Sequence, residues 1–110
     1  MCDATLTKKL INKYPKILIC LCSPIYRYLL TEQEDGDTLE NPAGYTLADY
    51  VKVVEDIANE YHLPFFNHYN AGINYYNRAT YLQQASTHLT YTDGARLIGD
   101  RLASEIEYVL

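Results

Sequence analysis

The sequence lacks the features that mark membrane, exported or nucleic-acid-binding proteins. Its longest apolar run, "ILICLCSPI", is far shorter than the roughly 20 residues that span a bilayer. No basic start followed by an apolar stretch marks a signal peptide. No dense Lys/Arg cluster occurs, and the formal net charge of −5 argues against general nucleic-acid binding. We therefore expect a cytoplasmic protein that binds neither a membrane nor nucleic acid.

Cysteine is scarce, with three residues in the whole chain. Cys20 and Cys22 lie two apart inside the apolar run, which places both on one face of a strand. No further Cys or His follows at zinc-ligand spacing, so we expect no metal site, and no motif indicates a cofactor. All three cysteines are predicted to be reduced and structural, packing as small hydrophobic side chains.

What is present fits one α/β domain over residues 1–110. Leu6, Leu10, Ile11 and Tyr14 have helical spacing, and Pro15 ends the helix that they predict. The nearly uniform apolar run at 16–22 then predicts a strand buried on both faces, as in a parallel sheet.

The middle of the chain predicts a crossover. Residues 24–45 are acidic and irregular, and we interpret them as a long loop. Thr46 is a candidate N-cap for an amphipathic helix over 47–61, and "LPFF" (63–66) follows as a second strand. Strand, helix and strand form a βαβ unit, whose strands should be parallel and whose crossover should be right-handed.

The last part of the chain predicts a loop and a helix. Residues 67–91 are expected to be loop with a short helical turn. Thr90 and Asp93 have capping-box spacing before the closing helix. Its predicted buried stripe consists of Ala95, Leu97, Ile98, Leu102, Ala103 and Ile106.

The sequence predicts about two parallel strands and three main helices, and two strands are too few for a complete sheet. Two strands alone rarely form a stable sheet, and a strand as apolar as 16–22 needs neighbours on both edges. The chain therefore reads as part of a larger α/β sheet, or as one that completes its sheet with a second copy in a homodimer.

Three phrases, in this order, resemble the C-terminal half of an SGNH/GDSL hydrolase: "LINKYPKILICLCSP", "YVKVVEDIANEYHLPFFNHYNAGIN" and "THLTYTDGARLIGDRLASEI". The likeness covers essentially the whole chain. It implies a partial three-layer α/β/α, flavodoxin-like fold and a serine esterase or acylhydrolase activity on a small-molecule ester. In that family a Ser of a Gly-Asp-Ser motif is the nucleophile, and a Gly-x-Asn-Asp motif contributes to the oxyanion hole.

His88 is the residue that matches the catalytic base of this family. The orienting Asp three residues earlier is replaced by Ala85, and no Gly-x-Asn-Asp occurs. The "GDTL" at 36–39 resembles the nucleophile motif with Thr for Ser, but it lies in an acidic loop rather than after a first strand. On residues alone, the favoured reading of His88 is an exposed loop histidine near a helix N-terminus, because most lone histidines have no chemical role. The family resemblance is what favours the position of a catalytic base.

Four other polar residues are candidate site residues, but the sequence does not favour a site role for any of them. His62 suits the C-terminal end of its helix, and His68 follows the second strand, where packing or exposure is favoured over a site role. Asn67 stands where the family often has Asp. Ser23 ends its strand, and the Pro24 after it has no N–H to bind an oxyanion.

Two hypotheses follow. The first is a truncated SGNH/GDSL-type hydrolase that needs an N-terminal part carrying the nucleophile and is inactive by itself. The alternative is a catalytically inactive, hydrolase-like module that binds a partner or assembles with itself.

Overall fold

The computed structural model describes residues 4–29, 34–83 and 88–110, and within them it forms a small α/β fold. Its central feature is a pair of short parallel strands, β1 (Leu21–Cys22) and β4 (Phe65–Phe66). Leu21 pairs with Phe65 and Cys22 with Phe66. The predicted parallel pairing is therefore confirmed, although regular strand geometry covers less of the chain than the apolar runs suggested.

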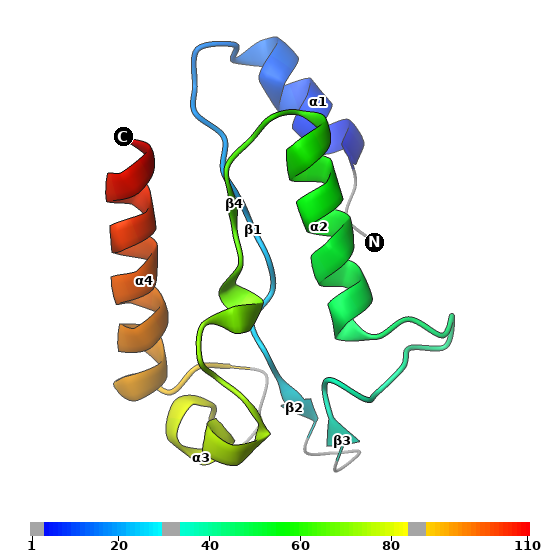
Figure 1. The fold of residues 1–110 in the computed structure, drawn as a ribbon, viewed down its shortest axis with the longest axis vertical. Coiled ribbons are helices and arrows are strands. Elements are labelled where there is room, and N and C mark those ends of the chain that lie inside the picture. Colours follow the sequence, from blue (N-terminus) through cyan, green and yellow to red (C-terminus); the bar gives the residue numbers. More distant parts are fainter. Residues whose placement is uncertain (1–3, 30–33, 84–87) are drawn as a thin grey trace.

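In the part of the chain that the structure describes, four α-helices accompany this pair (Figure 1). The long crossover helix packs against both strands, and the C-terminal helix runs along the other side of the pair. The helices are α1 (Ala4–Lys13), α2 (Leu47–Glu60), α3 (Arg78–Tyr81) and α4 (Asp93–Val109). Both strands run toward the end of the molecule where α3 and the start of α4 lie, so their carboxyl ends share that end.

The crossover helix α2 forms as its sequence predicts. The Thr46 N–H donates to Asp49 Oδ2 at 2.8 Å, which satisfies one N–H at the helix N-terminus. The inward face carries four buried residues at helical spacing: Val51, Val54, Ile57 and Ala58. Together with the buried Phe66 of β4, they supply much of the apolar contact between helix and sheet.

The C-terminus of α2 ends in a left-handed residue. His62 has φ of 57°, its N–H donates to Asn59 O, and the Leu63 N–H donates to Ala58 O at 2.8 Å. This is the Schellman arrangement, in which the left-handed position is usually occupied by Gly. His62 is exposed there and has a structural place, as expected.

The prediction that residues 24–45 form one irregular loop is wrong. Two short strands, β2 (Tyr28–Leu29) and β3 (Glu34–Asp35), pair antiparallel within it. The fully buried Tyr26 precedes β2, and its hydroxyl donates to Asp35 Oδ1 at 2.8 Å. Tyr26, Ile73 and Leu82 form a second core cluster, so the segment is anchored by packing as well as by strand pairing.

Residues 67–83 and 88–91 contain more regular structure than expected. Two 3₁₀ turns, His68–Asn70 and Tyr75–Asn77, precede the short α3. An isolated antiparallel bridge then joins Leu82 to Leu89, just before α4. The Thr90 hydroxyl accepts a hydrogen bond from the Gly94 N–H at 2.8 Å. The capping-box spacing indicated the N–H of Asp93, one residue earlier.

Two burial predictions are wrong. Residues 16–22 were expected to be buried on both faces, but Ile17 and Leu18 are 52% and 53% exposed, and Cys22 is exposed as well. In the expected stripe of α4, Leu97, Ile98 and Leu102 are half-buried and Ile106 is 44% exposed. The physical reason is shared: β1 pairs on one edge with β4, and within the described residues no further strand lies on its other edge to extend the sheet under α4.

Candidate functional site

Polar residues follow both parallel strands at their carboxyl ends. Ser23 comes directly after β1, and Asn67 and His68 come directly after β4. Ser23 is buried, its Oγ accepts from the Tyr69 N–H at 2.9 Å, and it lies 3.4 Å from Asn67 Oδ1. Asn67 Oδ1 also accepts from the Asn70 N–H at 3.1 Å. These bonds tie the two strand ends together, which agrees with the structural reading of Ser23.

His68 is buried and contacts Glu105, a residue far from it in the sequence. Its Nε2 lies 2.6 Å from Glu105 Oε1 of α4, and its ring stacks on Phe66 with centroids 6.5 Å apart. Arg101, one turn before Glu105, donates from Nη2 to Asn67 O at 3.0 Å. The Arg101 Nε is buried and has no hydrogen-bond partner among the described residues, since Glu105 Oε2 is 3.8 Å away. His68, Glu105, Arg101 and Asn67 thus fix α4 to the end of β4.

His88, the predicted catalytic base, directly precedes Leu89, the bridge partner of Leu82, and so lies shortly before α4. Its side chain is exposed, and no side chain of the described residues forms a hydrogen bond with it. Gln83 binds this segment: its backbone N–H donates to His88 O and its Nε2 donates to Leu89 O, each at 2.9 Å. Ala85, the position of the missing orienting Asp, falls outside the described residues.

The turn after β3 contains the "GDTL" sequence. The Thr38 hydroxyl donates to Asp35 O at 3.1 Å, and the Tyr69 hydroxyl donates to Asp37 Oδ1. Burial, and secondarily the charge of Asp35, raises the pKa of the Asp37 carboxyl. Thr38 is therefore a turn residue among carboxylates, as its context in the sequence indicated.

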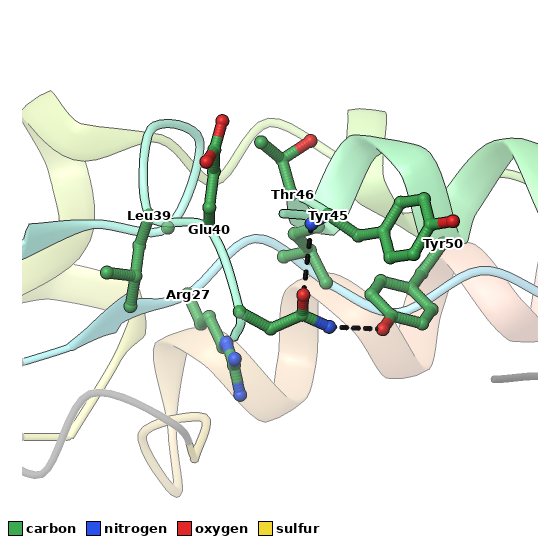
Figure 2. A pocket seen from close by; sticks show the side chains of 9 residues that line it. Arg27, Leu39, Glu40, Tyr45, Thr46 and Tyr50 are labelled. Carbon is green, nitrogen blue, oxygen red and sulfur yellow. Dashed lines mark hydrogen bonds between the residues drawn. The ribbon is translucent and has the colours of Figure 1, made fainter. Parts of the chain in front are cut away.

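A cavity of about 260 Å³ lies between this turn and the start of α2 (Figure 2). Its walls combine apolar, aromatic and charged side chains: Arg27, Gly36, Leu39, Glu40, Asn41, Tyr45, Thr46, Leu47 and Tyr50. No motif in the sequence pointed to this cavity, because its residues come from three separate segments that only the fold brings together.

Two general features bear on the class of protein. Within the described residues, no helix has the length and apolar character needed to cross a membrane. In the same part of the chain, His, Cys, Asp and Glu side chains form no cluster of three or more that could hold a metal ion.

No protein-family model matches the chain, and no curated protein matches its sequence at a significant level. Three solved structures share its fold over 96% of its length. One crystal structure gives a TM-score of 0.79 at 20% identity, and a protein from Lactobacillus plantarum gives 0.78 at 22%. The third is the salicylyl-acyltransferase SsfX3 from a tetracycline biosynthetic pathway, with a TM-score of 0.68 at 17% identity.

The chain is shorter than each of these proteins. It spans 50% and 51% of the first two and 30% of the acyltransferase. What the similarity shows is a common α/β architecture.

Proposed function

We propose that this chain is the C-terminal half of an SGNH/GDSL-type hydrolase domain with a flavodoxin-like, three-layer sandwich. It would take part in ester or acyl hydrolysis once an N-terminal part supplies the nucleophile. The observation that carries the proposal is the match of 96% of the chain to part of an acyltransferase, because acyl transfer and ester hydrolysis share the attack of a nucleophile on an acyl carbon.

The position of His88 supports its role as the base. The helix that it precedes, α4, begins at the end of the molecule toward which both parallel strands run (Figure 1), and α/β proteins place their reacting groups at that end. The His88 side chain is exposed and uncommitted among the described residues, so it is free to meet a group from another segment.

The chemistry follows from this position. His88 would accept the proton of a serine hydroxyl as its oxygen bonds to the ester carbonyl carbon, and would return the proton to the departing alkoxide. Ser23 does not suit the role of nucleophile, because it is buried and its oxygen already accepts from the Tyr69 N–H.

An esterase assay on two forms of the protein tests this function. The 110-residue chain and a form extended by the residues encoded in frame before Met1 would be assayed with p-nitrophenyl butyrate. We expect turnover from the extended form alone, and a loss of about 10³-fold or more on His88→Ala. His62→Ala, an exposed histidine at the end of α2, is the matched control.

Unchanged turnover of the His88→Ala variant would contradict the assignment of the base. Turnover by the 110-residue chain itself, lost on His88→Ala, would instead contradict the need for a separate nucleophile.

A second candidate function is a catalytically inactive, hydrolase-like module that assembles with itself. Two observations favour it: the apolar side chains of Ile17 and Leu18 are exposed, and β1 has one strand partner within the described residues. A strand edge with unpaired backbone groups is a ready template for another strand. Sedimentation over a concentration series distinguishes this module from a monomer.

A further inference from the structure

The cavity beside α2 does not include His88 among its lining residues, so the proposed hydrolysis does not account for it. At about 260 Å³ it is somewhat smaller than the roughly 300–1,000 Å³ of sites for drug-sized molecules. It therefore suits a molecule of metabolite size. Leu39 and Leu47 contribute apolar wall, and the ring of Tyr45 is 44% exposed.

The polar framework of the cavity is already satisfied within the protein. Asn41 Oδ1 accepts from the N–H groups of Ala43 and Tyr45, each at 3.0 Å, and Asn41 Nδ2 donates to the Tyr50 hydroxyl at 2.5 Å. The Tyr45 and Tyr50 rings meet edge to face, with centroids 6.2 Å apart. This framework fixes the wall of the cavity and leaves few of its polar atoms free for a ligand.

Arg27 and Glu40 are the two charged residues that line the cavity. Neither forms an ion pair or a side-chain hydrogen bond with any described residue. Figure 2 shows their side chains extending in opposite directions, so the cation and the anion do not neutralise each other. The cavity thus offers one positive and one negative group, separated by an apolar and aromatic wall.

We infer that this cavity binds a small zwitterion whose ammonium and carboxylate groups are separated by an apolar chain. The carboxylate pairs with Arg27, the ammonium with Glu40, and the chain lies against Tyr45 and the leucines. A simple anion would leave Glu40 unpaired and a simple cation would leave Arg27 unpaired. A ligand without net charge also avoids repulsion by a protein of net charge −5.

Titration of the ¹⁵N-labelled chain with ε-aminocaproate, followed by NMR, tests this site. We expect shifts confined to the cavity residues, with weaker binding of hexanoate, of hexylamine and of glycine, whose charges are too close together. Arg27→Gln and Glu40→Gln should each weaken ε-aminocaproate binding about tenfold. Arg96→Gln and Glu107→Gln, exposed on α4, are matched controls that should bind as the unmodified chain does.

Each of three results would overturn the inference. These are the absence of shifts at the cavity residues, binding of hexylamine or hexanoate as tight as that of ε-aminocaproate, and unweakened binding by both cavity variants. The same spectra report whether each variant is folded, and both substitutions lie at exposed positions. Because the assay measures binding alone, its result is independent of the esterase test.

Discussion

His68 Nε2 lies 2.6 Å from Glu105 Oε1, so the residue that follows β4 is joined to α4 across 37 positions of sequence. The side chains are 7% and 18% exposed, which means that water replaces little of this interaction if it is broken. With the Arg101 bond to Asn67 O, it is the main polar attachment of α4 to the parallel strands within the described residues.

Removing the carboxylate of Glu105 should therefore destabilise the fold. We expect Glu105→Ala to lower the free energy of unfolding by about 1.5–3 kcal/mol, because His68 is left buried without its partner. Urea unfolding followed by circular dichroism measures this change. Glu107→Ala, exposed on the same helix, should change it by less than about 0.5 kcal/mol, and equal effects of the two variants would show that the contact adds nothing.

The two glycines of α4 should respond to alanine in opposite directions. A Cβ at Gly94 would lie 2.2 Å from Tyr81 O, whereas a Cβ at Gly99 would meet nothing within 4 Å. We expect Gly94→Ala to cost about 1–3 kcal/mol by overpacking and Gly99→Ala to gain about 0.5–1 kcal/mol from lower backbone entropy in the unfolded chain. Urea midpoints of the pair provide the comparison, and a stable Gly94→Ala would refute the close packing of α4 against α3.

Glycine should be favourable where α2 ends. His62 holds the left-handed conformation at φ of 57°, which is strained for a residue with a Cβ. We expect His62→Gly to raise the free energy of unfolding by about 0.5–1 kcal/mol, while His62→Ala, which keeps the strain, should not. Thermal unfolding of both variants checks this. A gain shared by His62→Ala would assign the effect to the imidazole rather than to the backbone.

The thiol of Cys22 should react slowly at neutral pH. Partial burial, then the negative charge of Glu105 and finally Cys20 raise the pKa of the Cys22 thiol. Since the thiolate is the reactive form, the alkylation rate by iodoacetamide should still be rising at a pH where a free thiol has levelled off. Glu105→Gln should move the midpoint of the rate–pH curve for Cys22 to lower pH. Unfolding in urea should move it further, because burial is the larger cause of the raised pKa. Mass spectrometry measures the extent of Cys22 alkylation at each pH and so gives both midpoints. Identical midpoints in the folded and the unfolded chain would contradict the raised pKa of the thiol.

What the sequence could predict depended on how local the determining contacts are. Thr46 and the spacing from Val51 to Ala58 define α2 within one segment, and the helix forms as expected. His68 and Glu105 meet only through the tertiary fold, and no spacing rule relates them. The β2–β3 pairing was missed because each strand has two residues, too few for a period-2 pattern.

Burial was the property that the sequence predicted worst. The apolar character of residues 16–22 correctly indicated a parallel strand, but β1 has one strand partner within the described residues and the segment before it is exposed. Burial requires neighbours on both edges, and composition cannot show whether they belong to the same chain. His88 could be singled out only by the family resemblance, since an exposed histidine in a turn carries no physical signature of its own. Its role as base stays a prediction.

The exposed apolar segment before β1 should drive association of the 110-residue chain. Ile17 and Leu18 are each about half exposed, and β1 has one strand partner within the described residues. Transfer of such side chains from water is favourable by about 25 cal/mol per Å² of apolar surface buried. We therefore expect concentration-dependent sedimentation, and a shift to monomer in the double variant Ile17→Lys, Leu18→Lys, because charges on an edge oppose strand pairing. Tyr91→Lys, at a residue 90% exposed in the turn before α4, is the control and should associate as the unmodified chain does. A chain that stays monomeric at every concentration would show that this surface does not bind a second copy.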